Sequence, residues 1–156
     1  MTSVDSRLSG PRSPEQRKRE ALKRLTRDND VWVATADTTG DPCLVPLAFW
    51  WDGEAVWLST RVTNPTGRNL SATGQARLCF GHTRDVVLVH GTARMLTREE
   101  LPAEVGDAFA AKDGWDPRQD HRSYVFFQVV PEVLQAWGTV PEMNGRTLMR
   151  EGKWLV

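Results

Sequence analysis

Cys43-Leu-Val-Pro-Leu-Ala-Phe-Trp-Trp51, followed by Asp52-Gly53, is the stretch that decides the fold. Successive side chains of a β-strand point to opposite faces, so the stretch has two apolar faces. One face carries Leu44, Pro46, Ala48 and Trp50, and the other carries Val45, Leu47, Phe49 and Trp51. A sheet with one face in water would not need two apolar faces. A barrel core on one side, and a second subunit or a flat aromatic ligand on the other, would cover both.

Strand patterns on either side of this stretch extend it into a sheet. Asp52-Gly53 is a two-residue hairpin signal, so the next strand returns antiparallel. Gly91 lies inside a long strand pattern, which indicates a bulge or a close backbone approach. Pro131 interrupts the last long strand. The expected strands are Val31–Ala36, Cys43–Trp51, Ala55–Thr60, Ala76–Phe80, Val86–Leu96 and Ser123–Trp137, with a small hairpin about Glu151-Gly152.

Helix signals are inserted between these strands. Ser13 is an N-cap before Pro14, and the helix runs to Arg27. A short helix is expected over Thr66–Thr73, and a third begins at Thr97-Arg98-Glu99-Glu100 and continues to about Lys112. Hairpin-connected strands with a few helices predict a mainly β, α+β fold, a closed antiparallel barrel with helical additions.

The 156 residues fit one domain. Residues 1–12 have little apolar content and are expected to be a flexible lead-in to a single domain over residues 13–156. No stretch is apolar enough to span a bilayer, and the N-terminus lacks the apolar core of a signal peptide. Cys43 and Cys79 lie in apolar runs without a Cys-x-x-Cys spacing, which indicates buried free thiols and a cytoplasmic protein.

Charge and motifs exclude several classes of function. The 20 Lys and Arg residues balance the 20 Asp and Glu residues, so no global field attracts nucleic acid or an anionic membrane. His82, His90 and His121 show no metal-ligand spacing with the cysteines, so no metal site is expected. Neither a Gly-x-Ser-x-Gly elbow nor a Gly-x-x-x-x-Gly-Lys loop is present. The classes of function that remain are redox chemistry and cofactor binding.

Leu58-Ser-Thr-Arg-Val-Thr-Asn-Pro-Thr-Gly-Arg-Asn-Leu70 runs from a strand end through a polar loop into a helix start. Free N–H groups at a helix start, and the positive end of its dipole, favour an anion such as a phosphate. Hydroxyl groups of Ser59, Thr60 and Thr66 and the guanidinium of Arg68 are candidate donors. A polar connection with a solvated arginine is the alternative interpretation.

A set of short motifs in a fixed order resembles the split β-barrel family of pyridoxamine 5'-phosphate oxidase-like proteins. The motifs are Trp32-Val33-Ala34-Thr35-Ala36, Leu44-Val45-Pro46-Leu47, Trp51-Asp52-Gly53, Leu58-Ser59-Thr60, Arg68-Asn69-Leu70 and Val89-His90-Gly91-Thr92-Ala93. The chain is particularly similar to small members that use flavin mononucleotide (FMN) or the deazaflavin coenzyme F-420. The resemblance implies an FMN-binding-like split barrel and a homodimer with cofactor sites at the subunit interface.

The resemblance also implies roles for individual residues. Ser59, Thr60, Thr66, Arg68 and Asn69 would contact the cofactor phosphate. Val45 and Pro46 would back the cofactor ring. Many relatives carry a lysine where this chain has Thr66, so a phosphate contact here keeps a hydroxyl but loses a cation. Replacing Thr66 with Lys is expected to strengthen binding if the pocket has only lost that cation.

Residues further along the chain are candidates for the pocket edge. Trp137 ends the last long strand, where relatives often bring a residue to the partner's cofactor; a tryptophan that fills core space is the equal alternative. His82, Arg84 and His90 could line the pocket mouth, against the alternative of surface or core histidines. No catalytic residue is assigned.

Three functions follow from the sequence. The first is an FMN- or F-420-dependent oxidoreductase that transfers a hydride to or from a small organic substrate. The second is a carrier or sensor of the same fold that holds a flavin or haem without turnover. The third is a structural dimer with a degenerate site.

Overall fold

A computed structural model describes residues 10–156. The helices are α1 (Pro14–Arg27), α2 (Pro65–Thr73) and α3 (Ala103–Asp113), with short 3-10 helices η2 (Pro117–Gln119) and η3 (Val140–Met143). The strands are β1 (Asp30–Ala36), β2 (Pro42–Trp51), β3 (Val56–Arg61), β4 (Gln75–His82), β5 (Asp85–Leu96), β6 (Tyr124–Trp137), β7 (Thr147–Arg150) and β8 (Lys153–Trp154).

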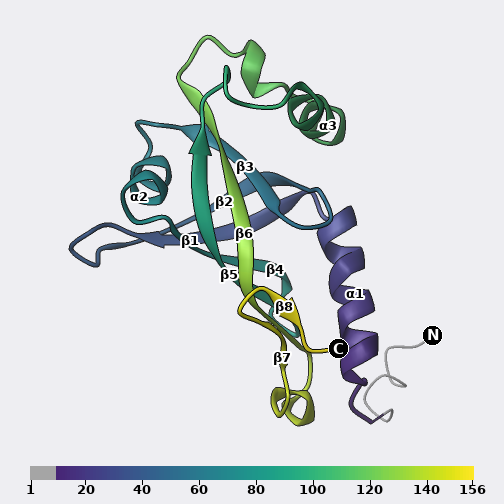
Figure 1. Cartoon of the computed structure of the whole chain (residues 1–156). Helices are drawn as coiled ribbons and strands as arrows, with labels where there is room; N and C mark the ends of the chain where they lie inside the picture. The colour runs from purple at the N-terminus through teal and green to yellow at the C-terminus, as the bar shows by residue number, and fades with distance from the viewer. Residues whose placement is uncertain (1–9) are drawn as a thin grey trace.

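Six antiparallel strands form a closed barrel. The strand order is β3-β2-β1-β4-β5-β6, and β3 also pairs with β6, which closes the ring. The 14-residue β6 runs from the α3 end of the molecule to the β7–β8 end (Figure 1). Its first half pairs with β3 and its second half with β7. The sequence-based prediction of a mainly β split barrel with helical additions is confirmed.

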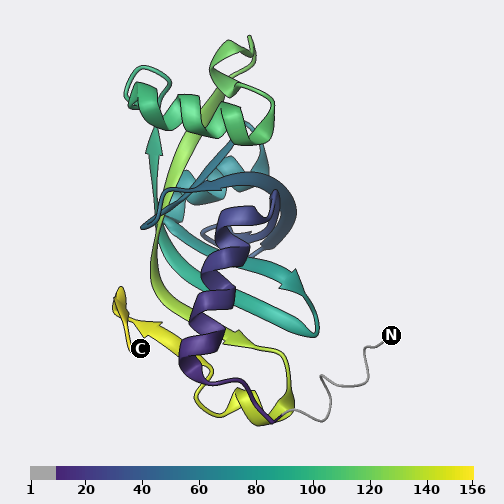
Figure 2. The same cartoon turned by 90° about the vertical axis from the view of Figure 1, so that its right-hand side faces the viewer.

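Helices α1 and α2 lie on opposite sides of the barrel in Figure 1, and Figure 2 shows α1 from the side, crossing the strands. Ala21 and Leu25 of α1 and Leu70 of α2 are at most 1% exposed and join the barrel core. A smaller core forms beneath α3 around Phe109 and Phe126, whose rings meet edge to face with centroids 5.6 Å apart. Burial of these apolar side chains stabilises the helices on the barrel.

The third helix begins later than the sequence predicts. Thr97 does form the expected capping contacts, since its hydroxyl oxygen accepts from the Glu100 N–H at 3.2 Å and Glu100 Oε1 accepts from the Thr97 N–H at 3.1 Å. The resulting turn stops because Pro102 has no N–H and disfavours a helical residue before it. The regular helix therefore starts at Ala103.

The irregularities expected in the strands occur at Gly91 and Pro131. These two residues face each other, and the β5–β6 register shifts between His90 and Gly91. A Cβ on Gly91 would lie 2.7 Å from Val129 Cγ1, so the glycine allows the close strand approach. Both cysteines are free thiols, and each is half-buried rather than fully buried.

Strand β2 has one face in the barrel and one face partly open. Phe49 is 1% exposed and lies in the barrel core. On the outer face Trp50 packs against the α3 core, but Leu44 is 62% exposed and Pro46 is also exposed. The expected cover over that end of the outer face is not supplied by residues 10–156.

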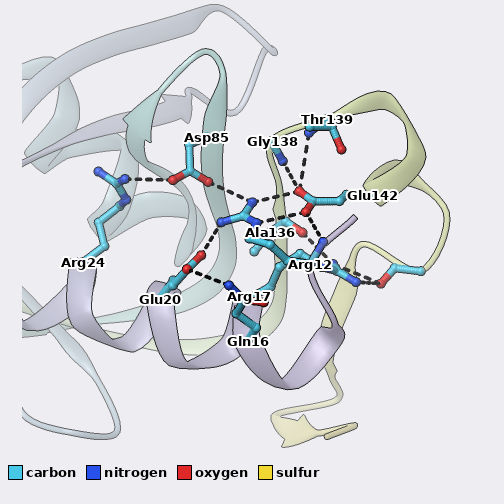
Figure 3. A network of polar contacts seen from close by, with 11 residues as sticks. Arg12, Gln16, Arg17, Glu20, Arg24, Asp85, Ala136, Gly138, Thr139 and Glu142 are labelled. Carbon is cyan, nitrogen blue, oxygen red and sulfur yellow. Dashed lines mark hydrogen bonds and ion pairs between the residues drawn. The ribbon is translucent and has the colours of Figure 1, made fainter. Parts of the chain in front are cut away.

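Arg12 joins the N-terminal segment to two distant parts of the chain (Figure 3). Its guanidinium bonds both oxygens of Glu142, at 2.9 Å from Nε to Oε2 and 2.8 Å from Nη2 to Oε1. It also pairs with Glu20 of α1 and Asp85 of β5. Residues 1–9 lie outside the described residues, but Arg12, expected in the flexible lead-in, is held by three carboxylates.

Candidate functional site

The candidate site is the junction of β3, the loop 62–64 and α2. Pro65 occupies the first turn of α2, where its missing N–H is not needed. Gly74 ends the helix in the left-handed conformation, with φ 64°. A Cβ on Gly67 would collide with the Arg61 carbonyl oxygen and lie 3.2 Å from the Arg61 carbonyl carbon. Glycine at position 67 therefore lets the first turn of α2 rest on the end of β3.

Thr66 and Asn69 face the barrel rather than the solvent. Thr66 is 2% exposed, with its Oγ1 3.6 Å from Cys43 Sγ on β2. Asn69 is 7% exposed, and its Nδ2 donates to Thr35 Oγ1 on β1 at 3.1 Å. These side chains fix α2 to two barrel strands, so their first role in this structure is to position the helix.

Ser59 and Thr60 lie on opposite faces of β3, because neighbouring residues of a strand alternate. The Ser59 hydroxyl donates to the Val125 carbonyl at 2.8 Å and is 6% exposed. Thr60 is 3% exposed, and its Oγ1 accepts from Asn64 Nδ2 at 3.2 Å. The single hydroxyl proton of Ser59 is used inside the protein, whereas that of Thr60 is not assigned to a protein acceptor.

Two N–H groups at the start of α2 are left without an acceptor among the residues that the structure describes. Asn64 is the N-cap, but its side chain does not cap the helix. Within residues 10–156 the N–H groups of Thr66 and Gly67 have no acceptor, while the Arg68 N–H bonds the Asn64 carbonyl at 2.9 Å. Arg68 is exposed, and its Nη1 bonds the Thr63 carbonyl. Free N–H groups beside a guanidinium fit a phosphate.

Arg61 is the residue of this site that the sequence interpretation passed over. It ends β3, is half-buried, and its Nε is buried without a hydrogen-bond partner in the described part of the chain. A signal was present in the sequence: residues 55–84 contain four arginines and neither Asp nor Glu. In a chain of zero net charge, such a run leaves its arginines without local carboxylate partners.

Val45 and Pro46 also lie on opposite faces of their strand. Val45 is half-buried and packs against the barrel core. Pro46 is exposed on the outer face, where it pairs with Trp32, itself 49% exposed. Pro46 can therefore contact a group outside the barrel, whereas the Val45 side chain points inward.

A cavity of about 480 Å³ opens beside this outer face. Thr35, the hydrogen-bond partner of Asn69, is part of its wall, so the cavity adjoins α2. His90 Nε2 lies 2.9 Å from Gln75 Oε1, and both residues line the cavity. The lining residues are Ala34, Thr35, Ala36, Gln75, Ala76, Arg77 and His90. Of the expected mouth residues, His90 lies here, whereas His82 lines a second cavity near the end of α1, and the wall of that second cavity includes Trp32 and Pro46.

Trp137 lies far from the junction within one chain. Arg61 pairs with Tyr124 at the start of β6, and Trp137 ends that strand. Thirteen strand residues span about 40 Å. Trp137 is half-buried, and the Arg146 guanidinium carbon lies 5.7 Å from its ring centroid. Only a second chain could bring this tryptophan to the α2 start.

The part of the chain over residues 10–156 contains no group of three His, Cys, Asp or Glu side chains placed to hold a metal ion. None of its helices combines the length and apolar character needed to cross a bilayer.

Comparison with protein families gives a match over residues 18–138 to the model described as pyridoxamine 5'-phosphate oxidase. None of the curated proteins matches the sequence.

Solved structures share the fold at low sequence identity. An F420 reductase is 19% identical, with a TM-score of 0.58 over 72% of this chain and 93% of the other. HutZ, a haem storage protein from Vibrio cholerae, is 19% identical, with a TM-score of 0.61 over 74% of this chain and 90% of the other. A putative pyridoxamine 5'-phosphate oxidase from Listeria innocua is 14% identical, with a TM-score of 0.64 over 78% of this chain and 98% of the other.

Proposed function

Because the chain belongs to the pyridoxamine 5'-phosphate oxidase family, we propose that it is an oxidoreductase that depends on FMN or coenzyme F-420. It would transfer a hydride between that cofactor and a small organic substrate. The observation that carries the proposal is the open start of α2, where two N–H groups lack an acceptor within residues 10–156 and Arg68 is exposed. A phosphate-bearing cofactor satisfies those donors.

The residues of the junction divide into binding and positioning roles. The Thr66 and Gly67 N–H groups and the Arg68 guanidinium would hold the phosphate. The Thr66 and Asn69 side chains and Ser59 keep α2 and β3 in place through Cys43, Thr35 and the Val125 carbonyl. Thr60 accepts from Asn64 Nδ2 and so positions the loop that leads into α2.

A homodimer is part of the proposal. The outer face of β1 and β2 leaves Leu44 62% and Trp32 49% exposed, and a second copy would cover them. An exposed apolar patch of this kind is typical of an interaction surface. The partner subunit would also bring a tryptophan to the cofactor edge, because Trp137 and the α2 start lie at opposite ends of β6 in one chain.

The protein's share of the reaction is binding, orientation and exclusion of water. The bound flavin or deazaflavin supplies the hydride chemistry. Pro46 and Trp32 give a flat apolar wall outside the barrel, against which a ring can lie. Burial raises the pKa of the Cys79 thiol near this wall, so that thiol stays neutral at pH 7. Free Cys43 and Cys79 support a cytoplasmic location.

The decisive experiment is a cofactor titration of the purified full-length chain. We expect FMN or coenzyme F-420 to bind at micromolar concentration or below, followed by turnover of the reduced cofactor with candidate carbonyl or alkene substrates. Failure of both cofactors to bind would refute the proposal. Haem is included as a third ligand, and a Soret band without flavin binding would favour the carrier function.

Arg68→Ala tests the phosphate contact directly. We expect cofactor affinity to fall about tenfold, because a charge-assisted hydrogen bond to the phosphate is lost. Isothermal titration calorimetry measures the change. Arg19→Met removes an exposed arginine from α1 and is the control. Equal affinities of Arg68→Ala and the unaltered protein would remove Arg68 from the site.

A further inference from the structure

Among the described residues, two arginines, Arg17 and Arg61, have an Nε that is buried without a partner. The Arg17 guanidinium still donates through Nη1 and Nη2 to the carbonyls of Ala136 and Gly145. Arg61 differs because its side chain makes no hydrogen bond or ion pair to any residue from 10 to 156. Each other buried or half-buried arginine donates to at least one oxygen. These arginines are Arg12, Arg17, Arg24, Arg98, Arg118 and Arg146. Burial of an N–H donor such as the Arg61 Nε without an acceptor is costly, so its retention here requires a reason.

The position of Arg61 supplies that reason. Its backbone carbonyl lies directly beneath Gly67, so the residue borders the open first turn of α2. Arg68 follows one residue after Gly67, and no acidic residue occurs from 55 to 84. Arg61, Arg68 and the positive end of a helix therefore border one loop, in a stretch of sequence that contains no acidic residue.

We propose that Arg61 is the principal cation for the phosphate group of the cofactor, in the absence of a lysine at position 66. The inference rests on the proposed function, because the phosphate is that of FMN or coenzyme F-420. The bound group would accept from the Arg61 guanidinium, including Nε, in the bidentate geometry that arginine favours with phosphate.

The burial of Thr66 explains why a cation besides Arg68 would come from β3 rather than from position 66. Thr66 is 2% exposed against Cys43, so its side chain points into the barrel end and away from an incoming anion. Arg61 is half-buried at the strand end and is long enough to keep its head group accessible while its stem packs.

The test compares ligands with and without phosphate. FMN and riboflavin form one pair, and coenzyme F-420 and its phosphate-free deazaflavin riboside form the other. We expect Arg61→Met to weaken binding of the phosphate-bearing ligand at least tenfold and to leave the phosphate-free ligand unchanged. Arg61→Lys should restore part of the loss. An equal effect on both members of a pair, or none, would overturn the proposal. The pair that responds distinguishes a phosphomonoester from a phosphodiester.

A second readout does not need the cofactor. Inorganic phosphate should raise the Tm of the unaltered protein and of the Arg19→Met control, but not that of Arg61→Met. Without phosphate, Arg61→Met should be at least as stable as the unaltered protein, because an unpartnered cation is removed. A lower Tm without phosphate would show a structural role and overturn the proposal. If phosphate stabilises through Arg61 but no flavin or deazaflavin binds, the proposed function fails while the anion site stands.

Discussion

At the scale of single residues, Glu142 shows how strongly the fold depends on one ion pair. Hydrogen bonds from Arg12 hold the pKa of Glu142 at about 2, compared with an ordinary value of 4.5. The carboxylate also accepts from the Gly138 N–H at 2.7 Å and is 2% exposed. The Glu142 side chain therefore links the end of β6 to the N-terminal segment.

This carboxylate predicts an acid-dependent loss of stability. The folded pKa is depressed, so the stabilisation is complete above about pH 4.5 and is lost as the pH falls toward about 2. The shift corresponds to about 3 kcal/mol. Urea unfolding at a series of pH values measures this loss of unfolding free energy. Glu142→Gln should be less stable at pH 7 and should show a flatter pH dependence than the unaltered protein between those limits. An unchanged slope would contradict the assignment.

The Thr66→Lys variant was expected from the sequence to strengthen cofactor binding, and the structure changes that expectation. A lysine at this 2%-exposed position would place its ammonium against Cys43 at the barrel end. Burial of an unpaired charge should lower the free energy of unfolding by about 2–3 kcal/mol. Thermal unfolding measures this loss of stability, and Ala72→Lys, which places the same charge on the exposed side of α2, is the control. A Thr66→Lys protein as stable as Ala72→Lys would refute this expectation.

At the scale of elements, the contact between α2 and β3 depends on Gly67. The atoms that an added Cβ would meet belong to the Arg61 backbone and cannot turn away. Gly67→Ala should therefore shift α2 outward, reduce stability by about 1–3 kcal/mol and weaken phosphate binding. Urea unfolding and FMN titration measure the two effects. Gly10→Ala is the control, since nothing lies within 4 Å of its added Cβ.

Local patterns predicted the elements well, and non-local packing limited the prediction of the site. Alternation and hairpin turns are local, so all six barrel strands were located. The predicted start of α3 was wrong because it was based on the capping pattern at Thr97 alone. Pro102 interrupts that turn, and the regular helix starts at Ala103. The burial of Thr66 and Asn69 depends on Cys43 and Thr35, which are 23 and 34 residues away in sequence. No local pattern shows that these strands lie beneath α2.

At the scale of the whole molecule, the open outer face of the barrel predicts the oligomeric state. Leu44→Glu places a charge where the second copy would pack, and it should convert a dimer to a monomer. Sedimentation velocity measures the change, and cofactor affinity should fall with it. Val140→Glu introduces the same charge at an 81%-exposed residue of η3 and is the control. A monomeric unaltered protein would contradict the homodimer.

The Arg12–Glu142 pair also bears on the order in which the chain folds. The two residues are 130 positions apart in sequence, and β3 closes the barrel with a strand that begins 63 residues after β3 ends. Contacts of such long range slow folding, because the chain loses the entropy of closing a long loop before the stabilising contacts can form. During synthesis Arg12 is made 130 residues before Glu142, so this ion pair cannot form until Glu142 has also left the ribosome. The segment around Arg12 is therefore made well before its partner is available.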